Sequence, residues 1–233
     1  MIKNLLKRAV SAIKGEKVLY FPGCVVSQSH PKISRNYRSM LLDAGVDFIT
    51  IDEFKCCGAT LLDAGYANEF SALKRNNLEL LEKAGVNRIT CSSPVCCRTL
   101  KKHYNLDTEH TVQTLDRQGY RPNPERGDVS YHDSCALTAD GVFSEPRSLL
   151  KKKGLSISEP IHTKEKAMCC GACGGLAQNN PQAASAMAKA RLSEMRSRTV
   201  VTACPFCYTH LSENIPPNSG KQVLELSEAI FDE

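Results

Sequence analysis

Short runs of apolar residues alternate along the chain with longer segments in which apolar positions recur every three or four residues. The longer segments have the period of an amphipathic helix, and the short runs have the composition of buried strands. Glycine directly follows several of the expected helices, as is typical of helix C-termini. The pattern predicts helices at 31–44, 70–84, 146–153 and 181–198 and strands at 46–51, 86–90 and 199–203. Strands that alternate with helices are typical of α/β units.

The cysteine motifs of the chain occur twice, in the same order. Each half has a lone cysteine after a strand-like run, then Cys-Cys-Gly-Ala, then a short motif that ends in cysteine. Between the lone cysteine and the pair lie 31 residues in the first half (Cys24 to Cys56) and 33 in the second (Cys135 to Cys169). The repeat predicts two pseudo-symmetric, Rossmann-like α/β lobes with cysteines in strand-end loops, where open α/β sheets place their sites.

We expect the lobes to span 18–118 and 128–233, joined by a polar linker at 119–127. The preceding segment, 1–17, has apolar residues on one helical face and lysine and arginine on the other. Such an amphipathic helix can lie on a membrane surface, dock on a partner subunit or cover the fold's own core. Docking on a partner and packing on the chain itself are equally reasonable.

Twelve of the 233 residues are cysteine, which is the unusual feature of the composition. An even count is compatible with a disulfide framework in a small secreted domain. The N-terminus lacks an apolar signal core and a chain of this length does not need cross-links, so we expect a cytoplasmic protein whose reduced cysteines bind metal. No run of about 18 apolar residues predicts a membrane span. The lack of tryptophan and a net charge of only +5 disfavour nucleic-acid binding.

The second half contains the complete candidate site. Its five candidate ligands are Cys135, Cys169, Cys170, Cys204 and Cys207. The Cys-x-x-Cys spacing alone serves zinc, a redox pair or a cluster. The adjacent pair favours a multi-metal cluster, because five thiolates exceed the four that a zinc ion or an ordinary four-iron cubane takes. A structural zinc site with a spare thiol is the alternative. For Cys91, Cys97 and Cys173, a place as small core residues is about equally expected.

These motifs resemble the cysteine-rich CCG domain, which occurs twice in the B and D subunits of heterodisulfide reductase. It also occurs in iron–sulfur subunits of glycolate oxidase, lactate-utilisation, glycerol-3-phosphate dehydrogenase and thiol:fumarate reductase complexes. The resemblance extends from Val18 to Leu211 and is carried by Phe21-Pro-Gly-Cys24, Tyr131-His-Asp-Ser-Cys135, Cys169-Cys-Gly-Ala and Thr202-Ala-Cys-Pro-Phe-Cys207. It implies a non-cubane [4Fe-4S] cluster on the five second-half cysteines, and reduction of a disulfide between two such clusters.

The first half departs from the family pattern at Ser93, where the motif requires cysteine. The remaining candidates are Cys24, Cys56, Cys57 and Cys96, with Cys91 close by in the sequence. Three outcomes are open: a cluster completed by Cys91, a four-thiolate cluster or zinc site, or no metal in this half. Serine oxygen suits iron less well than thiolate does. If this half lacks the unusual cluster, the two-cluster mechanism is in doubt.

The chain also lacks a ferredoxin-type cysteine run. We therefore expect electrons to come from a ferredoxin-like or flavin subunit, within a complex that can also include a membrane subunit contacted through 1–17. His132 is a candidate proton relay to a thiolate product, although the His132-Asp133 pair more often orients a loop. The expected function is disulfide reduction. The alternatives are an electron-transfer subunit of a lactate, glycolate or glycerol-3-phosphate dehydrogenase complex, and a zinc-stabilised interaction module.

Overall fold

The structure is a computed structural model that describes residues 17–231. The predicted amphipathic helix at 1–17 therefore lies outside the described residues, apart from its last position. The chain divides into two compact units, residues 1–120 and 121–233. Each unit is built on its own parallel sheet with helices on both faces, which confirms the predicted class of two pseudo-symmetric α/β lobes. In the described part of the chain, no helix is long and apolar enough to span a bilayer.

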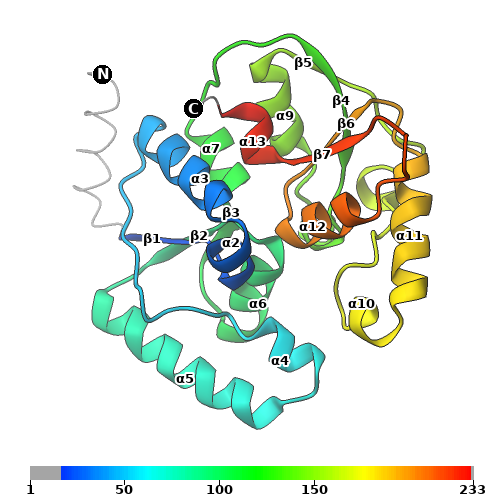
Figure 1. The fold of residues 1–233 in the computed structure, drawn as a ribbon. Coiled ribbons are helices and arrows are strands. Elements are labelled where there is room, and N and C mark those ends of the chain that lie inside the picture. Colours follow the sequence, from blue (N-terminus) through cyan, green and yellow to red (C-terminus); the bar gives the residue numbers. More distant parts are fainter. Residues whose placement is uncertain (1–16, 232–233) are drawn as a thin grey trace. The chain divides into compact units, whose positions relative to one another are not determined.

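Unit 1 is built on a sheet of three parallel strands in the order β1-β2-β3. Its elements are β1 (Val18–Phe21), α2 (Cys24–Ser29), α3 (Pro31–Asp43), α4 (Ala59–Asp63), α5 (Ala67–Ala84), β2 (Arg88–Cys91), α6 (Pro94–Tyr104), β3 (Thr108–His110) and α7 (Thr111–Arg117). Figure 1 shows α3 and α7 on one face of this sheet and α5 and α6 on the other. Leu19 and Phe21 of β1 pack into the core beneath α5 and α6. All four residues of β1 are buried, as expected for a strand covered on both faces.

Unit 2 has four parallel strands in the order β5-β4-β6-β7. Its elements are β4 (Gly127–His132), α8 (Cys135–Thr138), α9 (Ser144–Lys153), β5 (Leu155–Ile157), the short 3₁₀ helix η1 (Lys164–Lys166), α10 (Leu176–Asn179), α11 (Pro181–Ser193), β6 (Thr199–Thr202), α12 (Pro205–Glu213), β7 (Gln222–Glu225) and α13 (Leu226–Ile230). The core between the sheet and α11 and α12 contains Val200, Leu192 and Leu211. All pairings are parallel, so the carboxyl ends of β4 and β6 lie at one edge.

Two predicted elements differ from the structure. The strand expected at 46–51 is reduced to a single bridge, in which Ile49 pairs with Leu19 at the edge of β1 before the chain turns away. The helix expected to reach Arg198 ends at Ser193. The backbone N–H groups of Arg196 and Ser197 donate to the Ser130 hydroxyl at 3.0 Å, which draws this segment out of the helix toward β4.

Candidate metal centres

The five candidate cysteines of unit 2 come together at the carboxyl edge of its sheet. Cys135 is the first residue of α8, directly after β4. Cys204 caps the N-terminus of α12, directly after β6, and Cys207 lies in the first turn of that helix. The remaining pair, Cys169 and Cys170, lies in the loop that precedes α10. The parallel topology therefore brings three separate segments to one place.

The thiols of unit 2 form a continuous series of contacts. Cys135 and Cys169 share a hydrogen bond, as do Cys169 and Cys170. The Sγ atoms of Cys170 and Cys207 are 3.3 Å apart, and Cys207 also contacts Cys204. Cys173 is half-buried and lies close enough to raise the pKa of Cys135 by charge repulsion. All twelve cysteines of the chain lie in the described residues, and none forms a disulfide.

The Cys-Cys-Gly turn has the same geometry in both units. Gly58 and Gly171 have φ angles of +82° and +89°, which only glycine adopts without strain. Each glycine N–H donates to the first cysteine of its pair, at 3.3 Å to Cys56 Sγ and at 3.4 Å to Cys169 Sγ. A Cβ on Gly171 would lie 3.0 Å from the carbonyl oxygen of Ala184 on α11. The glycine therefore lets the pair lie directly against the helix.

The electrostatics of the unit 2 thiols favour a bound cation. Hydrogen bonds from Cys135 and Cys170 hold the pKa of Cys169 far below its usual range. The same interaction with Cys169 raises the pKa of Cys135 well above its usual range and that of Cys170 to about 12. One thiolate thus suppresses the ionisation of its neighbours. A bound metal centre would allow all of these thiols to ionise together, because coordinated thiols are deprotonated outright.

Unit 1 brings four of its five candidate cysteines together in the same way. Cys56 shares hydrogen bonds with Cys24 and with Cys57, and these lower its pKa. Cys57 in turn contacts Cys96. Gly23 permits this approach, since a Cβ there would lie 3.0 Å from Cys96 Sγ.

Cys91 lies apart from these four thiols in its hydrogen bonding. Cys91 is fully buried in β2 and shares a hydrogen bond with Cys97 of α6. Burial raises the pKa of Cys91, and the hydrogen bond with Cys97 raises it further. Ser93 caps the N-terminus of α6, and its buried hydroxyl has no hydrogen-bond partner within residues 17–231. The expected completion of a first-half cluster by Cys91 stays a prediction, and Ser93 occupies the place that cysteine has in the motif.

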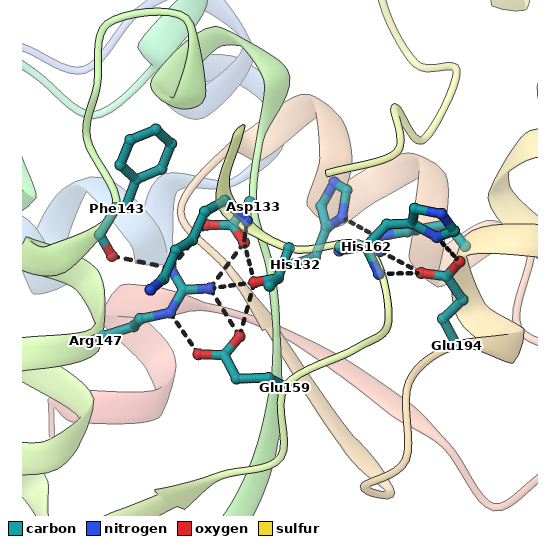
Figure 2. A network of polar contacts seen from close by, with 10 residues as sticks. His132, Asp133, Phe143, Arg147, Glu159, His162 and Glu194 are labelled. Carbon is teal, nitrogen blue, oxygen red and sulfur yellow. Dashed lines mark hydrogen bonds and ion pairs between the residues drawn. The ribbon is translucent and has the colours of Figure 1, made fainter. Parts of the chain in front are cut away.

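His132 lies at the end of β4, beside the unit 2 thiols. One of its ring nitrogens and the Sγ atoms of Cys170 and Cys207 all lie within 4.8 Å of one another. Arg191 of α11 donates from Nε to His132 Nδ1 at 3.0 Å. Figure 2 labels His132 in this network of polar contacts. Burial, together with the positive charge of Arg191, lowers the pKa of His132 to about 3. A role as proton relay remains a prediction for this residue.

A second polar network, also drawn in Figure 2, fixes the loop that leads to Cys135. Arg147 of α9 makes a bidentate pair with Asp133, with both N–O distances at 2.8 Å. It also donates from Nε to Glu159 at 2.6 Å. Asp133 Oδ2 accepts from the backbone N–H of Lys164 as well. This arrangement supports the expectation that Asp133 orients a loop.

Sequence reasoning missed Arg147, Glu159 and Arg191. An arginine in a helix normally indicates a solvated position, and no motif distinguishes these from the surface arginines of the chain. Arg191 contacts His132, 59 positions away, and Arg147 contacts Asp133 across a turn of the fold, so only the fold reveals that the arginines are buried. The one signal in the sequence was the position of Asp133 directly after a strand, because a carboxylate buried there needs a cationic partner.

A cavity of about 580 Å³ opens beside Cys24 in unit 1. Its lining includes Arg35 and Arg38 of α3 and Lys55 from the loop before Cys56, together with Asp52. Arg38 also stacks over the ring of Phe48, 6.0 Å from its centroid. The excess of cationic side chains gives this cavity a chemistry suited to an anionic small molecule.

The model of the cysteine-rich CCG domain matches the chain twice, over residues 18–101 and 129–212. The chain therefore belongs to the CCG cysteine-rich domain family, as the repeated motifs predict. The two matched segments contain both groups of thiols described above.

Several curated relatives share this region. The chain is 29% identical over 209 residues to an uncharacterised iron–sulfur protein of Methanocaldococcus jannaschii, covering 85% of this chain and 42% of that protein. It is 29% identical to one subunit of a fumarate reductase (CoM/CoB) of Methanothermobacter marburgensis, covering 86% and 42%. It is also 29% identical to one subunit of a dihydromethanophenazine:CoB–CoM heterodisulfide reductase of Methanosarcina barkeri, covering 84% and 53%. The chain thus spans about half the length of these relatives, or less.

Proposed function

We propose that the chain is the iron–sulfur subunit of an oxidoreductase complex and reduces a disulfide at a non-cubane [4Fe-4S] cluster. The cluster would be held by Cys135, Cys169, Cys170, Cys204 and Cys207. The single observation that carries the proposal is the continuous contact of these five thiols at one sheet edge. Relatives with this region are named as iron–sulfur proteins and as subunits of oxidoreductases.

The donor set fits an iron–sulfur cluster better than a zinc ion. Zinc in structural sites takes four ligands in a closed tetrahedron. With five thiols in one series of contacts, a zinc site would leave one thiol that is not a ligand. A cluster of several irons can bind all five. The glycine N–H at Cys169 Sγ adds a donor of the kind that tunes cluster potentials.

Unit 1 would hold a second centre, on Cys24, Cys56, Cys57 and Cys96. This centre is a [4Fe-4S] cluster or a zinc ion, since the thiol count is compatible with either. The cationic cavity lies beside this unit 1 centre, where a disulfide or thiol that carries anionic groups would be attracted by Arg35 and Arg38 and would lie next to Cys24. If the unit 1 centre is a cluster, the cavity supports disulfide reduction there as well as in unit 2.

The reaction consumes two electrons and two protons for each disulfide converted to two thiols. A bound cluster supplies electrons one at a time and iron sites that accept thiolate sulfur. The electrons would arrive from a ferredoxin-like or flavin-containing partner subunit. Within the chain, the burial of Cys170, Cys204 and Cys207 keeps water from these three thiols, and the Asp133–Arg147 pair holds the loop before Cys135 in place.

Metal analysis of anaerobically purified protein tests the proposal. Iron with a matching amount of acid-labile sulfide supports the cluster, whereas stoichiometric zinc alone supports the alternative of a zinc-stabilised module. Adding a disulfide such as that of coenzymes M and B to the oxidised protein then separates enzyme from carrier. A substrate-dependent EPR signal supports disulfide reduction, and its absence favours the electron-transfer subunit of a lactate, glycolate or glycerol-3-phosphate dehydrogenase complex.

A further inference from the structure

Two buried N–H donors beside the unit 2 thiols have no hydrogen-bond partner among the described residues. They are His132 Nε2 and Arg191 Nη2, and both side chains are wholly buried. A buried donor left unpaired has lost its hydrogen bonds to water without replacement, so native proteins rarely tolerate one without a reason. The nearby acceptors are the sulfurs of Cys170 and Cys207, which lie within 4.8 Å of a His132 ring nitrogen. The orphan donors therefore point to an acceptor at the thiol site.

Arg191 decides which nitrogen of His132 carries the proton. A guanidinium group only donates hydrogen bonds, so His132 Nδ1 must accept from Arg191 Nε at 3.0 Å. A neutral imidazole that accepts at Nδ1 has its hydrogen on Nε2. Nε2 therefore has no free lone pair with which to bind a metal. Metal-bound histidines usually donate from their other nitrogen, which is the opposite arrangement. His132 is thus a hydrogen-bond donor at Nε2 and not a metal ligand.

Arg191 is itself fixed by two further contacts. Its Nη1 donates to the carbonyl oxygen of His162 and to Glu194 Oε2, both at 2.7 Å. Figure 2 shows this chain of contacts running from His132 toward His162 and Glu194. Because the guanidinium group is held on three sides, the imidazole ring it contacts is held as well. The direction of the Nε2–H group is therefore built into the fold of unit 2.

At the position that matches His132, the described part of unit 1 has a residue without an N–H donor in its side chain. Phe21 stands three residues before Cys24, as His132 stands three residues before Cys135, and each ends its strand. Phe21 packs against the ring of Phe54, with centroids 4.6 Å apart. A phenylalanine side chain, which carries no N–H donor, therefore stands where unit 2 has His132. The two cysteine sites are therefore electrostatically unequal.

We propose that His132, positioned by Arg191, donates an Nε2–H hydrogen bond to a sulfur of the unit 2 cluster and raises its reduction potential. This inference rests on the proposed function. A hydrogen bond to sulfur stabilises the more negative, reduced form of a cluster, so the potential rises. The positive charge of Arg191 acts in the same direction. A cluster in unit 1, which lacks this donor, would have the lower potential, and electrons would accumulate in unit 2.

The experiment uses the full chain, purified anaerobically, with its iron and labile sulfide measured in every variant. Redox titration followed by EPR gives the midpoint potential. We expect His132→Leu and Arg191→Leu to retain the cluster and to shift the potential downward. His132→Gln keeps an N–H donor and is expected to fall between the wild type and His132→Leu. His162→Leu is the matched control, because its half-exposed ring contacts Glu194 and the substitution keeps the backbone carbonyl that accepts from Arg191. Its potential should equal that of the wild type.

A second measurement uses only the wild-type protein, so its outcome does not depend on whether a variant folds. The wild-type protein is labelled with ¹⁵N-histidine and transferred to ²H₂O, and its reduced cluster is studied by electron–nuclear double resonance. We expect an exchangeable deuteron and a weak ¹⁵N coupling from one histidine. A full cluster without these couplings, or a His132→Leu potential equal to that of the wild type, overturns the inference and leaves the proposed function intact. Absence of iron and labile sulfide from the wild type overturns both.

Discussion

Ser93 and Cys204 occupy the same place in their two units. Each residue has extended backbone angles and caps the N-terminus of a helix that begins with proline, α6 in one case and α12 in the other. Cys204 contacts its neighbour Cys207 in the series of thiols. The Ser93 hydroxyl, in contrast, is buried and has no hydrogen-bond partner in the described part of the chain. The two units thus differ by one sulfur at an otherwise matched position.

Ser93→Cys is expected to restore the fifth thiolate of unit 1. Because thiolate binds iron better than a serine hydroxyl does, the iron and labile sulfide content per chain should rise. Anaerobic reconstitution followed by metal and sulfide analysis measures this. Ser93→Ala is the matched control and should leave the iron content unchanged. Loss of iron from Ser93→Ala would instead show that the hydroxyl is a ligand in the native protein.

Gly171→Ala is expected to destabilise the fold of unit 2. The substitution forces a side chain into a backbone with a φ angle of +89° and places Cβ 3.0 Å from the carbonyl oxygen of Ala184. Left-handed strain alone costs about 1–2 kcal/mol, and the contact with the backbone adds to it. Chemical denaturation measures the loss. Gly174→Ala is the control, because its φ angle is +70° with nothing within 4 Å of a Cβ, so it should lose only the strain contribution.

Arg147→Met should lower the free energy of unfolding by about 3–5 kcal/mol, since it leaves the Asp133 carboxylate buried without its partner. The side chains of Arg147 and Asp133 are 8% and 1% exposed. Arg117→Met provides the comparison: its side chain is 45% exposed in an ion pair with Glu109, and pairs of that kind contribute about 0–1 kcal/mol. Equal losses in the two variants would contradict the structural role assigned to the Arg147 network.

His110 is expected to make unit 1 sensitive to acid. Burial lowers the pKa of this histidine to about 4 from an ordinary value of 6.5. As the pH falls below 6.5 the unfolded chain takes up a proton that the folded chain refuses, so stability declines until the folded group protonates near pH 4. At about 1.4 kcal/mol per pKa unit, the total loss is about 3 kcal/mol.

Comparison with His110→Asn isolates this contribution from other acid-sensitive groups. Asparagine retains the helix-capping function that His110 has at the start of α7. The difference in unfolding free energy between the wild type and the variant should change between pH 6.5 and pH 4 and stay constant above pH 7. A difference that does not depend on pH would show that His110 is not held neutral by burial.

The cysteine repeat and the alternation of apolar runs predict the α/β class, because both depend on local pattern. The short strands β3, β5 and β7 were not predicted, and β3 shows why: Thr108–His110 is three residues long and polar. The pairing of Cys91 with Cys97 also lay beyond the sequence, since it depends on how α6 packs against β2. The partnership of His132 with Arg191 joins residues 59 positions apart, and no spacing rule connects them.

The central claim is tested most directly by the iron and labile sulfide content per chain of the anaerobic wild type and of Cys170→Ala. Cys170 is buried between Cys169 and Cys207, so its removal breaks the series of thiols in the middle. The account predicts iron with matching sulfide in the wild type and a loss of about one cluster in the variant. Equal iron in both proteins, or zinc in place of iron in the wild type, would contradict it.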